Sequence, residues 1–146
     1  MPSETELIRL YSDKILQMAA KPIYRERLSE PDASATKRSP LCGSAVTVDI
    51  NVKSGVISHY GQEVRACALG QASSTIVGKS IIGRSFTEVK KAYEELSEML
   101  KNNGPTPSEP FDDLYVLKPA AEYKNRHASI LLPLEATLAA FQKIED

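Results

Sequence analysis

The chain has 146 residues, the size of one domain that can bury a core without disulfides, and we expect a single domain over residues 1–146. Its 18 basic and 19 acidic residues give a net charge of -1, which removes the general attraction to phosphate that nucleic-acid binding needs. No apolar run approaches the ~20 residues that cross a bilayer, and no N-terminal leader pattern is present. We therefore expect no nucleic-acid partner, no membrane partner and a cytoplasmic location.

The first half of the chain reads as one helix followed by strands. Ser3 and Glu6 form a capping box, and Pro22 cannot continue the helix that they begin. Apolar and polar residues alternate over 45–52, as in a strand with one buried face, and 53–55 is a turn. The expected elements are a helix over 3–20, an edge strand near 35–38, and a hairpin of strands over 45–52 and 56–64.

The second half reads as helices joined by loops. Small residues after Cys67 predict a helix that can approach a neighbour closely, and Ser85 with Glu88 forms another capping box. Pro133 is tolerable if it lies near the first turn of the last helix. The expected elements are a helix from about residue 69, a helix over 85–101, at most a short helix within 111–121, and a final helix over 129–143.

Three soft ligands lie at the ends of expected elements: Cys42, Cys67 and His127. Thiolate and imidazole groups are the ligands that zinc and iron prefer, and element ends can aim them at one point. Two cysteines exclude a disulfide framework and a four-thiolate site within one chain. The spacings of 25 and 60 residues match no short metal motif, so two buried, inert cysteines remain an alternative.

Three stretches carry a family resemblance: LCGS over 41–44, ACALGQASS over 66–74 and RHAS over 126–129. They resemble the iron–sulfur cluster assembly scaffolds IscU, SufU and the N-terminal domain of NifU, and the inserted loop before the third stretch is more like SufU. The resemblance implies an α+β fold of the SufE/NifU-like type, with a small three-stranded antiparallel sheet covered by several helices. It also implies a non-catalytic monomer or weak homodimer, with a cysteine desulfurase and apo-protein cluster acceptors as partners.

The resemblance carries over only in part to the site. Cys42, Cys67 and His127 match family ligands, whereas Ser44 stands where an aspartate is common and Ala128 stands where the third cysteine belongs. The three retained groups would bind an iron ion, a nascent [2Fe-2S] cluster or, alternatively, zinc. Water, a partner's residue, a small thiol or a local carboxylate would have to complete four-coordination.

Three other interpretations stay open from the sequence. The fold could serve as an interaction module with a vestigial metal site, as the losses at Ser44 and Ala128 suggest. Cys67 and His127 could form the thiolate–imidazole pair of an enzyme, although no hydrolase signature surrounds Cys67. Cys42, after Pro40, could accept a persulfide from a desulfurase.

Overall fold

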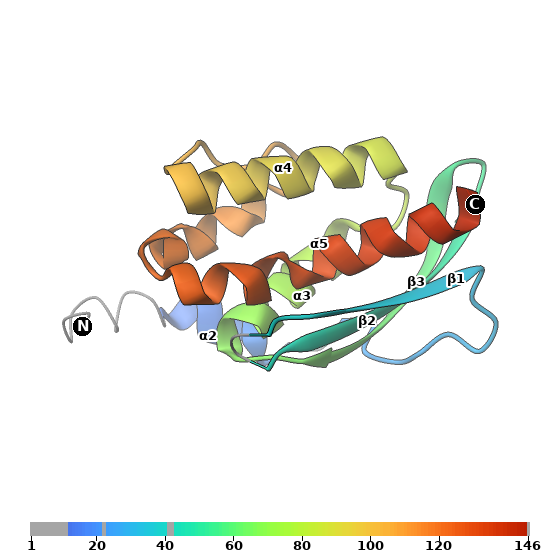
Figure 1. The fold of residues 1–146 in the computed structure, drawn as a ribbon, viewed down its shortest axis with the longest axis horizontal. Helices are drawn as coiled ribbons and strands as arrows, with labels where there is room; N and C mark the ends of the chain where they lie inside the picture. Colours follow the sequence, from blue (N-terminus) through green and yellow to red (C-terminus); the bar gives the residue numbers. More distant parts are fainter. Residues whose placement is uncertain (1–11, 22, 41–42, 146) are drawn as a thin grey trace.

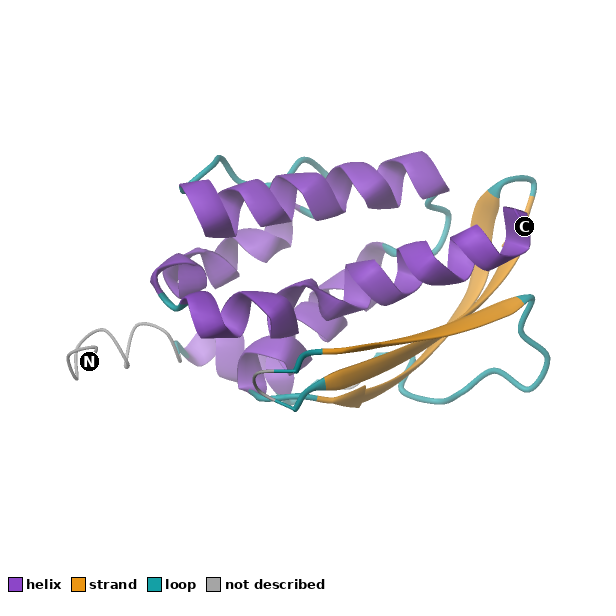
Figure 2. Ribbon diagram, in the orientation of Figure 1, coloured by secondary structure: helices purple, strands orange, loops and turns teal. Residues whose placement is uncertain are grey.

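The computed structural model describes residues 12–21, 23–40 and 43–145, and it confirms the predicted three-stranded antiparallel sheet. The strands are β1 (Ala33–Arg38), β2 (Ala45–Lys53) and β3 (Val56–Arg65), in the order β1-β2-β3. Figure 1 shows α5 (Lys124–Glu145) lying along the sheet and α4 (Phe86–Asn102) packed on the far side of α5. The architecture is thus a sheet covered on one face by two successive layers of helix (Figure 2).

The sheet register explains which face the helices cover. Val46, Val48 and Ile50 of β2 are fully buried, because every second residue of a strand points to the same face. Ile50 pairs with Tyr60 of β3, and the Tyr60 hydroxyl lies 3.1 Å from Oγ1 of Thr137 on α5. This buried polar contact helps to fix the position of α5 over the covered face.

The remaining helices follow local sequence signals. Ser85 caps α4 and forms the predicted capping box with Glu88, and Asn103 ends this helix in the left-handed conformation. Cys67 precedes α3, as the sequence predicts. The other elements are α2 (Asp13–Ala19), α3 (Ala68–Ser80) and the 3-10 helix η1 (Asp112–Glu122).

Two predicted boundaries differ from the structure. Helix α2 is capped by Ser12, while the predicted capping box at Ser3 and Glu6 lies outside the described residues. Helix α5 begins at Lys124, five residues before the predicted start at Ser129, so Pro133 lies inside the helix and not in its first turn. An interior proline removes one helical hydrogen bond, and the burial of the residues around it offsets that cost: Ile130, Leu132 and Leu134 are almost fully buried.

Asp49 anchors the segment before β1 to the outer face of the sheet. Its carboxylate is fully buried and accepts two hydrogen bonds from the Arg27 guanidinium, at 2.7 and 3.0 Å. The Leu28 backbone N–H and the Ser34 hydroxyl donate to the same carboxylate. Gly61 makes room for this segment, because a Cβ there would lie 2.4 Å from the Glu26 carbonyl oxygen. No helix in the described part of the chain is long and apolar enough to cross a membrane.

We expect Asp49→Asn to lower the free energy of unfolding by about 2 kcal/mol at pH 7, since hydrogen bonds to charged groups contribute about 1.5–3 kcal/mol and the half-exposed Arg27 is screened by solvent. Burial alone would raise the pKa of Asp49, but the hydrogen bonds from Arg27, Ser34 and Leu28 hold it below its ordinary value of 3.8. The stabilisation is therefore present above that value and is lost as the pH falls through the folded-state pKa.

Urea unfolding at several pH values checks this expectation. The difference between Asp49→Asn and the unmodified chain should shrink as the pH falls through the folded-state pKa, below which the carboxylate is protonated in both states. Asp112→Asn, at an exposed aspartate of η1, is the matched control and should leave stability unchanged. An equal loss of stability at all pH values would contradict the assigned role of the Asp49 charge.

Candidate metal centre

Cys67 occupies the junction between the sheet and the helices. It follows β3 and is the N-cap residue of α3, and its carbonyl oxygen accepts the first helical hydrogen bond, from the Gln71 N–H at 2.9 Å. The thiol is free and half-buried. The predicted placement of Cys67 at the end of an element is confirmed.

Two serine hydroxyls stand between Cys67 and the sheet. The Cys67 Sγ lies 3.8 Å from Oγ of Ser129 on α5, and this hydroxyl lies 3.0 Å from Oγ of Ser44, just before β2. Both serines are almost fully buried. The starts of β2 and α3 and the N-terminal part of α5 therefore converge at one corner of the molecule, which we call the Cys67 corner: Ser44, Cys67 and Ser129.

A glycine in α3 permits this convergence. A Cβ on Gly70 would lie 2.5 Å from the Ser129 hydroxyl oxygen and 2.7 Å from the Ala66 Cβ, which is closer than real contacts allow. One turn further, the Ser73 hydroxyl donates to the Ile130 carbonyl oxygen at 2.6 Å. The predicted close approach of the small-residue helix is thus confirmed, and its neighbour is α5.

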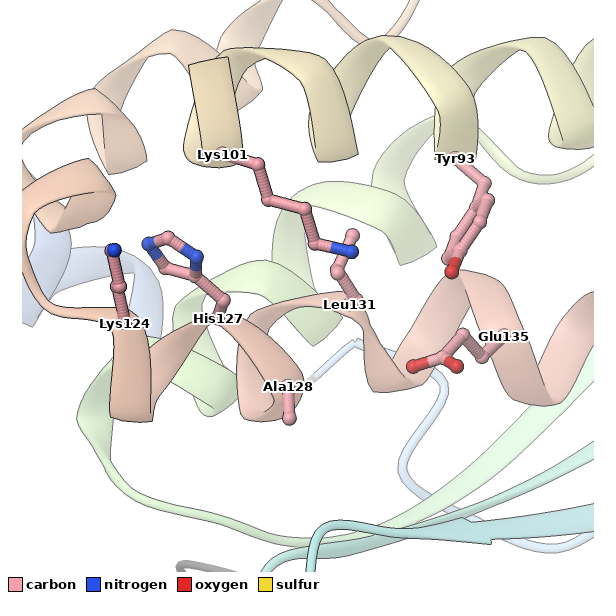
Figure 3. A pocket seen from close by; sticks show the side chains of 7 residues that line it. All are labelled: Tyr93, Lys101, Lys124, His127, Ala128, Leu131 and Glu135. Atoms are coloured by element: carbon pink, nitrogen blue, oxygen red, sulfur yellow. The ribbon is translucent and has the colours of Figure 1, made fainter. Parts of the chain in front are cut away.

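His127 lies in the N-terminal part of α5 and is turned toward η1. Its Nε2 lies 3.1 Å from the Ala120 carbonyl oxygen and 3.0 Å from that of Ala121. Carbonyl oxygens only accept hydrogen bonds, so Nε2 carries the proton and Nδ1 is the nitrogen left for a ligand. A backbone carbonyl that fixes the opposite nitrogen is the usual support of a metal-binding histidine. Figure 3 shows the imidazole on the side of α5 that faces α4, with the Ala128 methyl pointing away from it.

The structure tests the predicted ligand set only in part. Cys42 lies outside the described residues, so its relation to the other two ligands stays a prediction. Cys67 bonds to Ser129 and His127 bonds to η1, so these two side chains do not form the hydrogen-bonded pair that a thiolate–imidazole enzyme needs. Over residues 12–21, 23–40 and 43–145, no three His, Cys, Asp or Glu side chains are grouped to hold a metal ion.

Ser129 is the site residue that sequence reasoning missed. It stands in the RHAS stretch, but a serine near the start of a helix usually serves as a cap, so nothing local assigned it to Cys67. The usable signal was the pairing of small residues: a glycine three positions after Cys67 leaves room for a short polar side chain on the facing helix.

Comparison with known proteins identifies the family. Residues 10–128 match the family described as the NifU-like N terminal domain, and the chain belongs to this family. The iron–sulfur cluster assembly scaffold protein IscU of Thermotoga maritima is 28% identical over 90 residues, which are 62% of this chain and 63% of that protein. An IscU scaffold of Archaeoglobus fulgidus is 27% identical over 82 residues, 56% of this chain and 54% of the relative. The matches thus span less than two thirds of these relatives.

Solved structures support the same assignment. The N-terminal part of a NifU-like protein from Brucella abortus has 41% identity and a TM-score of 0.93, covering 96% of this chain and 97% of that one. A protein from Fervidobacterium islandicum, described as a putative iron-sulfur cluster assembly scaffold for the SUF system, has a TM-score of 0.80 at 19% identity, covering 91% and 97% of the two chains. The second likeness shows the fold alone.

We expect Gly70→Ala to distort the Cys67 corner and to lower the free energy of unfolding by about 1–3 kcal/mol, the usual cost of overpacking. The added methyl group would meet the buried Ser129 hydroxyl, and this clash outweighs the gain of about 1 kcal/mol in helix propensity. Thermal unfolding and the rate of Cys67 alkylation measure the two effects.

Gly78→Ala on the same helix is the matched control for this substitution. A Cβ there would lie 3.2 Å from an Ile23 methyl group, and this longer side chain can move aside. Gly78→Ala should therefore be close to neutral. Equal stability of the Gly70 and Gly78 variants would contradict the close α3–α5 approach.

Proposed function

We propose that this chain is an iron–sulfur cluster assembly scaffold that binds iron, zinc or a nascent [2Fe-2S] cluster through Cys42, Cys67 and His127. The observation that carries the proposal is the Cys67 corner, where a free thiol meets two chain segments in a protein of the NifU-like family. A cysteine desulfurase would supply sulfur in the cytoplasm, and apo-proteins would receive the product. The metal or cluster is cargo and not a permanent cofactor.

The chemistry of the donor set supports the proposal. Cys67 offers a half-buried sulfur, and Nδ1 of His127 is left as a ligand while Nε2 is tied to backbone carbonyl oxygens. Cys42 is two residues from Ser44, and two residues of chain span at most about 7 Å, so the second thiol is within reach of the same corner. Two sulfurs and one nitrogen leave a fourth position for water, a small thiol or a partner's residue.

Anaerobic addition of ferrous iron and sulfide, or of zinc, to metal-free protein tests the ligand set by absorbance and metal analysis. We expect one metal ion or cluster per protein chain. Cys67→Ala, Cys42→Ala and His127→Ala should each lower metal affinity about 10- to 100-fold or more, since losing a ligand costs at least as much as losing a residue that hydrogen-bonds to a ligand. His59→Ala, at an exposed histidine of β3, should bind normally. Absence of metal binding, or normal binding by Cys67→Ala, would overturn the proposal.

Ala128→Cys adds a complementary readout to the same titration. It restores a thiol where the scaffold family has its third cysteine, so zinc and cluster should be held more tightly than in the unmodified chain. An unchanged affinity in this variant would mean that position 128 does not face the site.

A second candidate function is an interaction module without metal. The hydroxyl groups of Ser44 and Ser129 lie within hydrogen-bonding distance of each other, so this part of the corner is satisfied without an ion. On this hypothesis the surface around the corner recognises a desulfurase or a target protein whatever the metal content.

Pull-down of a purified cysteine desulfurase by metal-stripped protein distinguishes the two functions. The scaffold function predicts that capture depends on Cys67 and increases when metal is restored. Equal capture by metal-free protein and by Cys67→Ala supports the interaction module instead. Circular dichroism of the variant controls for loss of the fold.

A further inference from the structure

A second concave site lies between α4 and α5, on the side of α5 that faces away from the sheet. Its volume is about 530 Å³, which exceeds the size of a single ion and suits a small organic molecule. Figure 3 shows Lys101 and Tyr93 extending from α4 toward α5, and His127 and Leu131 extending from α5 toward α4. The residues that line it are Tyr93, Lys101, Lys124, His127, Ala128, Leu131 and Glu135.

Two cations at this cavity form no direct ion pair with the described residues. Lys101 extends from α4 into the middle of the cavity, while Lys124 stands at the end near the start of α5 (Figure 3). Within the part of the chain that the structure describes, neither ammonium group has a carboxylate within 4 Å or a hydrogen bond to another group. Both are therefore available to negative groups of a ligand.

The opposite end of the cavity offers an acceptor. Glu135 is partly buried, and burial raises its pKa against the opposing effects of Lys37 and Lys101. Burial and the Glu135 charge also raise the pKa of Tyr93, which keeps the phenol protonated. No ion pair or hydrogen bond is formed by the Glu135 carboxylate with the described residues. A partly desolvated carboxylate that has no direct ion pair is stabilised by an incoming ammonium group.

The order of these charges sets the length of the ligand. Along α5, Lys124 and Glu135 are eleven residues apart, about 16 Å at 1.5 Å per residue, and Lys101 lies between them. A free amino acid is too short for both ends, whereas three extended residues span about 10 Å and long lysine side chains cover the remainder. Leu131 places an apolar side chain between the ends.

We infer that this cavity binds a peptide of about three residues that carries one ammonium group and two carboxylates. The ammonium group pairs with Glu135, the carboxylate beside it pairs with Lys101, and the distant carboxylate pairs with Lys124. Tyr93 donates its hydroxyl at the Glu135 end. His127 lines the same cavity, so the two sites share one residue. The inference does not require bound metal, because none of the three groups that pair with the peptide, Lys101, Lys124 and Glu135, is a proposed metal ligand.

Titration of metal-free, isotopically labelled protein with reduced glutathione, followed by backbone amide shifts, tests the inference. Glutathione has the required one ammonium and two carboxylates, and S-methylglutathione keeps these charges without the thiol. We expect saturable binding of both, with shifts on α4 and α5, and much weaker binding of trialanine amide, which has no carboxylate. Failure of glutathione to saturate, or equal binding of the amide, would overturn the inference.

Charge-neutralising variants locate the ligand within the cavity. Lys101→Gln, Lys124→Gln and Glu135→Gln should each weaken glutathione binding about tenfold, the effect of one charge-assisted contact. Lys91→Gln, at an exposed lysine of α4 outside this cavity, is the matched control and should leave affinity unchanged. Equal affinity in all four variants would overturn the assignment. Because no metal is present, failure here leaves the proposed scaffold function intact, and the reverse also holds.

Discussion

The close approach of α3 to α5 at Gly70 is the constraint on which the site depends. The missing side chain of Gly70 leaves space for the Ser129 hydroxyl, which reaches both Cys67 and Ser44. The Ser73 hydroxyl bonds to the α5 backbone one turn further and holds the two helices together. A larger residue at position 70 would separate the helices and with them the three segments that form the corner.

Helix α5 contributes side chains to both the Cys67 corner and the cavity beside α4. One side packs on the sheet through Thr137 and Tyr60 and presents Ser129 to Cys67. Another side forms the cavity with α4, where Glu135 and Lys124 stand near its two ends. His127 belongs to the second side in the described structure, because its Nε2 is bonded to the carbonyl oxygens of η1. If Cys67 and His127 bound one metal ion together, the histidine would bind it through Nδ1. The ligand would then come from the first turns of α5, where His127 lies.

The family resemblance implies an aspartate at position 44, where this chain has a serine that belongs to the Cys67 corner. A serine hydroxyl is a poor metal ligand at neutral pH, but it donates and accepts hydrogen bonds, and the Ser44–Ser129 contact does so. The corner thus keeps a thiol in a defined place while it holds fewer ligands than four-coordination needs. On the proposed function, a labile site from which cargo can leave is the expected consequence of so few ligands.

The sequence by itself determined the elements whose signals are local. The alternation over 45–52, the turn before β3 and the Ser85–Glu88 capping box each act within a few residues, and the structure confirms them. The small residues that follow Cys67 placed it at a helix start, and the family likeness supplied the sheet topology. The predicted start of α5 was wrong. A proline is placed in the first turn because it lacks a helical hydrogen bond, but here the burial of the residues around Pro133 offsets that loss. Only the tertiary structure decided that Ser129, 62 residues from Cys67, meets its thiol, and that charged side chains of α4 and α5 face one cavity. Such contacts depend on how helices pack, which no local pattern records.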